Sequence, residues 1–272
     1  MWASTLLLVA ATALPNQPAG LQIKNVRVTT GPFGATRDKE VPELQYGDIF
    51  YVYYDIENLE VDNQGQAQYT ISMEVSNGKG SVIYSDGPRD GTANLTLGGG
   101  KMPAFTTTTV GKEDPGEYTV KVTIVDRGNK KTVDLTRKFK IKKPEFGIVQ
   151  PSLKFYTKSG RETIDAPALC VVGQTPVATA FVGSFARDKD DNPDLEITFN
   201  VVDLATKNSI TEKPAVQTIK KGIPKDQDFI QILYPVELNR TGKFKIEMVA
   251  TDKISKKKDT FTFPITVEEG SK

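Results

Sequence analysis

The chain has 272 residues, 38% of them hydrophobic, which is enough apolar material for two domains with cores of ordinary size. Its 35 basic and 34 acidic side chains nearly cancel, so the net charge favours neither nucleic acid nor an anionic membrane surface as a partner. Histidine is absent and Cys170 is the only cysteine, which excludes histidine-dependent catalysis, an intrachain disulfide and thiolate zinc sites, and argues against an enzyme.

The first residues predict export from the cytoplasm. An apolar segment begins at Leu6 and ends in Ala-Thr-Ala at 11–13, which fits the small-x-small rule for signal peptidase. We therefore expect a signal peptide over 1–13, an N-terminal segment over 14–20 and a secreted or surface-bound mature protein. Basic residues before the apolar core are missing, so a disordered apolar tail is the alternative. No window approaches the roughly 20 apolar residues of a membrane-spanning helix, so we expect no membrane insertion.

Alternating apolar and polar residues predict β-strands in the rest of the chain. In residues 116–126 every second side chain is apolar, which places the apolar set on one face of a strand and would scatter it around a helix. Glycine, proline and asparagine clusters separate such runs, and no amphipathic helix of about ten or more residues is evident. The expected strands are roughly 22–30, 48–57, 68–76, 81–85, 93–97, 104–110, 117–126 and 132–141, repeated in the second half from about 147.

The pattern recurs after 126 residues. Setting each residue against the one 126 positions later aligns 47–141 with 173–267 without a gap, and the apolar residues keep their phase from strand to strand. In this alignment Pro88 meets Pro214. We therefore expect two copies of one domain, at 21–142 and 147–268, with a linker at 143–146 and a tail at 269–272.

The turn before the alternating run resembles the tyrosine corner of immunoglobulin-like β-sandwiches and, more remotely, of cadherin and fibronectin type III modules. Asp114, Gly116 and Tyr118 match the Asp-x-Gly-x-Tyr pattern, while Val120 stands where that family has its second cysteine. The resemblance implies that the Tyr118 hydroxyl bonds to the backbone just upstream. It also implies that packing, without a disulfide, holds the two sheets together.

The second copy keeps part of this corner. Gly242 matches the glycine, but Phe244 replaces the tyrosine, so the ring contact is kept while a hydrogen bond worth about 1 kcal/mol is lost. Ile246 takes the cysteine position. The resemblance and the strand pattern predict an all-β protein of two tandem immunoglobulin-like antiparallel β-sandwich domains related by internal duplication.

An acidic loop in the second half suggests calcium. Asp188, Asp190, Asp191 and Asp194 place four carboxylates close together in sequence, and calcium takes about six to eight oxygen ligands. In a tandem this loop should lie near the linker, which resembles the calcium-stiffened junctions of cadherins, although lysines replace their acidic linker motif. A solvated acidic loop is the alternative. We expect no other cofactor.

Tyr51 and Tyr53 are candidate ligand-binding residues. If the residues between and beside them point into the core, both tyrosines point outward, where aromatic rings stack on sugars or anchor protein partners. Cover by a neighbouring strand is the alternative. The second copy has Val177 and Thr179 at these places, so this surface would belong to the first domain only.

The expected function is that of a non-catalytic, secreted or cell-surface-associated binding or structural module that contacts a protein partner. The alternative is a carbohydrate-binding protein that uses the exposed aromatics of the first domain. An enzyme would have to rely on paired carboxylates, and no cleft holding such a pair is evident from the sequence.

Overall fold

The structure, a computed structural model, describes residues 20–31, 34, 36–37, 39–157 and 163–270. The signal peptide predicted for 1–13 and most of the 14–20 segment lie outside these residues. Every regular element in the described part is a β-strand, which confirms the all-β prediction, and no helix there could cross a membrane. The strands form four sheets, arranged as two β-sandwiches with a hydrophobic core each.

The first sandwich has three strands facing five. The small sheet has the order β1-β3-β6, with β1 at Gln22–Thr29, β3 at Ile49–Glu57 and β6 at Met102–Thr109. The large sheet has the order β2-β8-β7-β4-β5, with β2 at Glu43–Leu44, β8 at Thr132–Ile141, β7 at Gly116–Asp126, β4 at Gln66–Asn77 and β5 at Val82–Asn94. β5 and β6 are both sheet edges, because each pairs with one neighbour only.

The second sandwich has four strands facing five. One sheet has the order β10-β9-β12-β15, with β10 at Thr163–Asp165, β9 at Gly147–Tyr156, β12 at Val177–Gly183 and β15 at Phe229–Pro235. The other has the order β11-β17-β16-β13-β14, with β11 at Leu169–Val171, β17 at Lys257–Glu268, β16 at Gly242–Asp252, β13 at Leu195–Asp203 and β14 at Ala215–Ile219.

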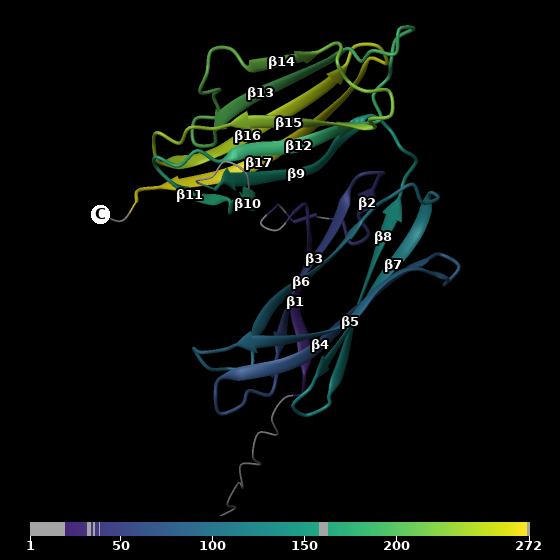
Figure 1. The fold of residues 1–272 in the computed structure, drawn as a ribbon. Helices are drawn as coiled ribbons and strands as arrows, with labels where there is room; N and C mark the ends of the chain where they lie inside the picture. The colour runs from purple at the N-terminus through teal and green to yellow at the C-terminus, as the bar shows by residue number, and fades with distance from the viewer. Residues whose placement is uncertain (1–19, 32–33, 35, 38, 158–162, 271–272) are drawn as a thin grey trace, which may run out of the picture.

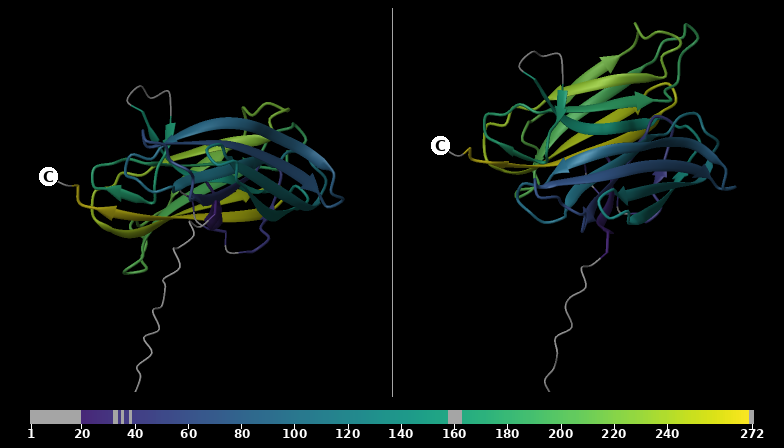
Figure 2. Two further views of the ribbon diagram at one scale, coloured as in Figure 1. Left: turned by 90° about the horizontal axis from the view of Figure 1, so that it is seen from below. Right: turned by 60° about the horizontal axis from the view of Figure 1, so that its bottom comes forward.

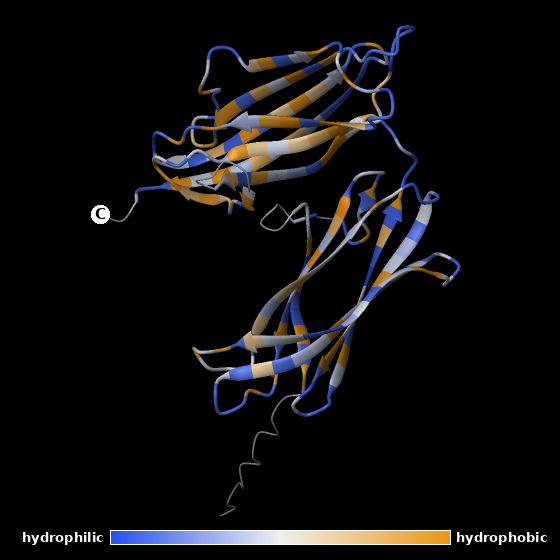
Figure 3. Ribbon diagram, in the orientation of Figure 1, coloured by the Kyte–Doolittle hydropathy of each residue, from blue (hydrophilic) through white to orange (hydrophobic). Residues whose placement is uncertain are grey.

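Residue-by-residue alternation produces both cores, and the alternating colours along the strands in Figure 3 show it directly. In β3, Phe50, Val52, Tyr54 and Ile56 are buried and the residues between them are half-buried. Burial of each such side chain contributes about 1.5–3 kcal/mol. Phe50 packs on Phe139 of the opposite sheet with 4.8 Å between ring centroids, so the two sheets are held together by side-chain packing.

Strand pairing recurs at the same spacing in both sandwiches. β7 and β16 begin 126 residues apart and pair with β8 and β17 in the same register. Each large sheet also carries a short parallel edge strand, in which Leu44 lies opposite Ile141 and Cys170 lies opposite Val267. These pairs are again 126 residues apart.

Two buried aspartates hold equivalent hairpins. Asp126 and Asp252 are both 0% exposed. The Asp126 carboxylate accepts hydrogen bonds from the backbone N–H groups of Glu60 at 2.7 Å and Gly128 at 2.9 Å. The Asp252 carboxylate accepts the same bonds from the residues 126 positions later, Ala186 and Ile254, at 2.8 and 2.9 Å.

The structure corrects the separate strands predicted at 81–85 and 93–97: a single strand, β5, runs from Val82 to Asn94, and residues 95–97 lie outside it. The sequence Asp-Gly-Pro at 86–88, expected as a turn, forms a bulge where the register against β4 shifts. Gly87 has a φ of 90°, a conformation that glycine adopts without strain. A bulge on an edge strand also tolerates proline, because no neighbouring strand needs its missing N–H.

The gapless alignment is wrong for β5 and β6. Thr106 of β6 and Tyr234 of β15 lie opposite equivalent residues of β3 and β12, yet they are 128 positions apart. β5 and β14 are shifted in the same way, so Pro88 and Pro214 are not equivalent. The cause is a longer connection before β14 than before β5.

Residues 142–146 connect the two sandwiches, and Phe146 already belongs to the second core. In Figure 1 the second sandwich lies across one end of the first, and β1 begins at the opposite end. Figure 2, seen from below, shows the first sandwich in front of the second.

The sandwiches contact each other beside the linker. The Tyr46 and Phe229 rings lie 4.8 Å apart between centroids, and the Tyr46 hydroxyl donates to Asp228 at 2.9 Å. The Gln150 side-chain amide donates to the Gly47 carbonyl at 2.7 Å. Aromatic packing and hydrogen bonds therefore fix the junction, in addition to the short linker.

Candidate binding surfaces

Tyr51 and Tyr53 lie on the outer face of the small sheet, as the alternation predicts, but neither ring is free. Both are half-buried. Arg27 and Phe105 pair with Tyr53 from the two flanking strands. The Arg27 guanidinium lies 5.5 Å from the Tyr53 ring centroid and the Phe105 ring lies 5.5 Å from it, so neighbouring strands cover much of this ring. Phe105, at 55% exposed, is the most open aromatic of the three.

The second sandwich reaches this face through Asp165 of β10. Burial raises the pKa of Tyr51 and of Tyr53, and the negative charge of Asp165 raises both further. The aromatic face thus combines exposed ring surface with one carboxylate, which is the chemistry of a hydrogen-bonding platform for polar ligands.

A groove runs between the edge strands β5 and β6, because the three-stranded sheet is narrower than the five-stranded sheet that it faces. Its larger part has a volume of about 700 Å³, with walls from Ile83 and Tyr84 of β5 and Thr107–Thr109 of β6. Val75 and Tyr118 belong to its floor, and they keep only 2% and 6% of their surface exposed. The exposed apolar surface therefore comes from the β5 wall, where Ile83 is 45% and Tyr84 48% exposed.

The groove continues along β6 past Phe105. A smaller part of about 270 Å³ shares Asp86 and Thr107 with the larger part. The groove therefore follows β6 from Phe105 to Val110, a run of about 17–20 Å at 3.3 Å per residue.

The rim of the groove is acidic. Glu113 and Asp114 line it, and neither forms an ion pair within the described part of the chain. Asp86 also lines it, but Arg89 lies 2.6 Å from its carboxylate. Two uncompensated carboxylates therefore stand at one end of the groove.

The four aspartates proposed for calcium are not brought together. Asp191 lies 3.1 Å from Lys225, and Asp194 lies 3.8 Å from Lys220. Among the described residues, no three acidic, histidine or cysteine side chains gather so that they could hold a metal ion. Two of the four carboxylates lie beside lysines in this arrangement, and the calcium site stays a prediction.

Asp188 instead closes a turn that occurs in both sandwiches. Its Oδ1 accepts from the N–H groups two and four residues later, both at 2.9 Å. Asp62, 126 residues earlier, makes the same two bonds at 2.8 and 2.9 Å. Gly65 has a φ of 76° in the first turn and Asp191 a φ of 67° in the second, and aspartate is among the few residues that adopt this conformation.

We expect Asp188→Ala to lower the free energy of unfolding by about 1 kcal/mol, because two backbone N–H groups lose their acceptor. Asp190→Ala, in the same exposed loop, is the matched control and should leave stability unchanged. Urea unfolding with and without millimolar calcium measures both. A calcium-dependent stabilisation of the unmodified protein that both variants abolish would support the calcium site.

The corner around Tyr118 has the hydrogen bond that the sequence pattern implies. The Tyr118 hydroxyl donates to the Asp114 carbonyl at 2.7 Å. In the second sandwich Phe244 fills the equivalent place at 5% exposure. A Cβ on Gly242 would meet the Phe244 ring at 2.8 Å, whereas a Cβ on Gly116 would meet nothing within 4 Å, so only the second corner needs its glycine for space.

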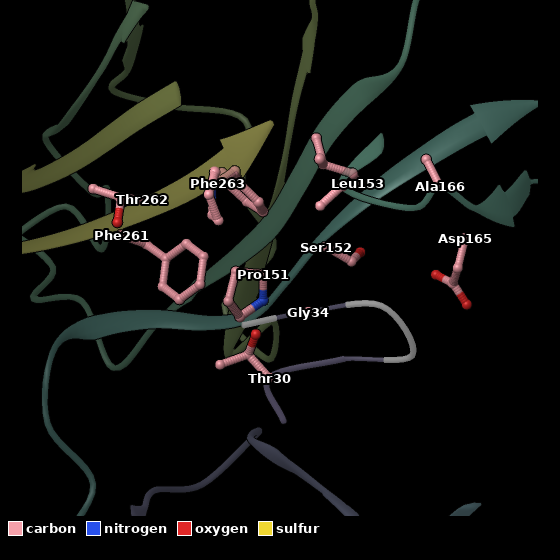
Figure 4. Close-up of a pocket in the computed structure, with 12 residues that line it drawn as sticks. Thr30, Gly34, Pro151, Ser152, Leu153, Asp165, Ala166, Phe261, Thr262 and Phe263 are labelled. Atoms are coloured by element: carbon pink, nitrogen blue, oxygen red, sulfur yellow. The ribbon is translucent and has the colours of Figure 1, made fainter. Parts of the chain in front are cut away.

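A small cavity of about 130 Å³ lies between the two sandwiches, and Figure 4 shows residues of its wall. Thr30 and Gly34 reach it from the first sandwich, and Pro151 and Phe261 from the second. Asp165 is the one charged side chain among the described residues that line it. Ligand pockets are usually several times larger, from about 300 Å³, so we read this cavity as a packing gap.

Sequence reasoning missed Phe105, Asp165 and the groove. Phe105 precedes four threonines in β6, Met-Pro-Ala-Phe-Thr-Thr-Thr-Thr, so no apolar–polar alternation marks it as outward-facing. The other two depend on which strands become neighbours, and no local pattern reports that.

Comparison with known proteins identifies no family. No family model matches the chain, and no curated protein matches it. Among solved structures, an alkylpurine DNA glycosylase, AlkC, of Pseudomonas fluorescens bound to abasic-site DNA has a TM-score of 0.31 at 12% identity, over 46% of this chain and 31% of that one. Dimeric latent PorU of Porphyromonas gingivalis has a TM-score of 0.39 at 10% identity, over 95% of this chain and 21% of that one. The chain spans less than a third of either, and neither likeness bears on function.

Proposed function

We propose that the chain is a non-catalytic binding protein built from two immunoglobulin-like β-sandwiches that arose by duplication of one domain. The repeated strand register, the paired hairpin aspartates and the paired turns at Asp62 and Asp188 support the duplication, because all recur at a spacing of 126 residues. The corner at Tyr118 supports the immunoglobulin-like assignment. The apolar segment ending at 11–13 supports a location outside the cytoplasm.

The proposed partner is a protein that binds the first sandwich at the β5 edge. The observation that carries this proposal is the exposure of Val82, Ile83 and Tyr84, at 55%, 45% and 48%, on a strand whose outer edge pairs with nothing in the described chain. Proteins usually protect such edges with charges, proline or cover, since an apolar free edge recruits another chain. Residues 82–84 of β5 include no charged residue and no proline, although the later part of the strand has Pro88.

Site-specific photo-crosslinking tests the proposal. A benzoylphenylalanine at Tyr84 should yield one discrete crosslinked protein in extracts of the native cell surface or surrounding medium, and excess unlabelled chain should suppress it. Val216, 58% exposed on the equivalent edge strand β14, is the matched control and should yield none. No product at Tyr84, or equal products at both positions, would overturn the proposal.

Carbohydrate binding at the aromatic face is the second candidate. The contact between Tyr53 and exposed Phe105, beside the Asp165 carboxylate, favours it. Glycan-array binding that Phe105→Ala abolishes and Val82→Ala preserves would support this candidate, and absence of binding to every glycan would remove it.

A further inference from the structure

The two sandwiches differ at equivalent grooves, and this difference indicates what the first groove binds. The second sandwich has a groove of about 200 Å³ in the same place, lined by Val201 and Phe244 where the first has Val75 and Tyr118. The first groove is about 700 Å³. Because the two share their floor, the residues above the floor account for the difference.

An ion pair holds Arg240, one of the residues that line the second groove. Arg240 lies 3.0 Å from Asp203, and its guanidinium lies 5.0 Å from the centroid of the Phe244 ring on the groove floor. At the equivalent positions, 126 residues earlier, the first sandwich has Asp114 and Asn77, which form no such pair. The first groove therefore lacks the arginine that lies over the floor of the second.

The strand edge is also blocked in the second sandwich only. Tyr234 and Pro235 of β15 stand where β6 has Thr106 and Thr107. Tyr234 stacks on Phe199 with 4.3 Å between ring centroids, which fills the groove, and Pro235 has no backbone N–H to offer. β6 carries neither proline nor charge from Ala104 to Thr109, so its outer edge is available for pairing.

We propose that an extended strand of the partner protein adds to the free edge of β6 and fills the groove of the first sandwich. Strand addition to an open edge is an established recognition mode, in which the backbone provides affinity and alternate side chains provide specificity. Apolar side chains of the strand would pack against Ile83 and Tyr84, and a lysine or arginine would lie beside Glu113 and Asp114. This inference rests on the proposed function, and it adds the kind of segment that is recognised.

The charge of the rim selects this occupant over a second copy of the chain. The β6 edge of a second copy, from Ala104 to Thr109, carries no basic side chain that could pair with Glu113 and Asp114. A basic strand would neutralise these carboxylates, and such charge complementarity favours the right partner over others.

Defined peptides test the inference on the full chain. The probe is a capped heptapeptide of alternating valine and lysine; the controls are alternating valine and glutamate, and the lysine peptide with a central proline. In amide NMR spectra we expect the lysine probe to shift the signals of 106–109 and 82–86, and we expect neither control to do so. Shifts elsewhere, or equal binding of the glutamate peptide, would overturn the inference.

Exchanging the residues of the Arg240–Asp203 ion pair with their counterparts in the first sandwich provides matched variants. Asn77→Asp with Asp114→Arg should narrow the first groove and weaken the lysine probe about tenfold or more, because it places an ion-paired arginine over the floor and reverses a rim charge. Asp203→Asn with Arg240→Asp should leave binding at the first groove unchanged. Ile83→Lys, on the exposed wall, should weaken binding similarly without altering the core, so the test does not depend on one variant folding.

Two further results separate the possibilities. Crosslinking at Tyr84 without any peptide-induced shift along β6 would leave the proposed function in place and overturn the inference. Sedimentation showing a dimer that Ile83→Lys abolishes would also overturn it, because the occupant would then be a second copy.

Discussion

Replacing Asp252 with alanine is expected to destabilise the second sandwich by about 3–5 kcal/mol. The carboxylate is fully buried and accepts hydrogen bonds from the N–H groups of Ala186 and Ile254, and from the Ser255 hydroxyl at 2.6 Å. Hydrogen bonds to a charged group contribute about 1.5–3 kcal/mol each, and a buried donor left without an acceptor adds its desolvation cost. The loss is therefore larger than for any single surface contact.

Hydrogen exchange read separately for each sandwich measures this effect. Protection of β16 and β17 should fall in the Asp252→Ala protein, while β7 and β8 keep theirs. Asp126→Ala should instead lower the protection of β7 and β8 and leave that of β16 and β17 unchanged, because Asp126 occupies the equivalent hairpin. Asp134→Ala is the surface control: its ion pair with Lys121 at 2.9 Å is exposed and contributes at most about 1 kcal/mol. Equal loss of protection in all three variants would contradict the expectation.

The same carboxylate makes stability depend on pH. Burial alone would raise the pKa of Asp252, but hydrogen bonds from the Ser255 hydroxyl and from the N–H groups of Ala186, Ser255 and Ile254 together hold it below its ordinary value. The folded state thus binds this proton more weakly than the unfolded chain, whose aspartate pKa is about 3.9. The stabilisation is present above that pH and is lost as the pH falls through the folded-state pKa. Asp252→Ala should remove this part of the acid dependence.

Local sequence patterns predicted the strands, because the alternation of apolar and polar residues can be recognised without knowing which strands pair. β7 and β8 lie within one residue of their predicted bounds. The prediction failed at β5, because a glycine–proline pair that ends an interior strand is tolerated at a sheet edge, and no local pattern marks a strand as an edge. The short parallel strands β2 and β11 were missed for a similar reason, since their pairing depends on residues about 100 positions away.

The candidate sites were less predictable because they depend on long-range pairing. The phase of β3 placed Tyr53 outward, but Arg27 and Phe105 reach its ring from other strands. The difference between the two grooves depends on the two-residue shift that places Tyr234 at the position of Thr106. The turn in the acidic loop could be predicted from the sequence, because an aspartate repeated after 126 residues, at Asp62 and Asp188, indicates a shared turn.

Gly47→Ala is expected to lower stability by about 3 kcal/mol and to loosen the junction between the sandwiches. Gly47 has a φ of 90°, where a non-glycine residue is strained by about 1–2 kcal/mol. A Cβ there would also lie 2.5 Å from two carbons of the Phe229 ring, which belongs to the second sandwich. Relieving such an overlap costs about 1–3 kcal/mol, and it would move Phe229 away from Tyr46.

Gly173→Ala separates these two causes. Gly173 lies 126 residues after Gly47 and has the same φ of 90°, but a Cβ there would meet nothing within 4 Å. Gly173→Ala should therefore lose only the stability that backbone strain costs. The difference in stability loss between the two variants then measures the overlap with Phe229. Small-angle scattering should show a more extended particle for Gly47→Ala only. If both variants lose equal stability and keep the same scattering, the Phe229 contact does not hold the two sandwiches together, and the linker and the remaining hydrogen bonds orient them.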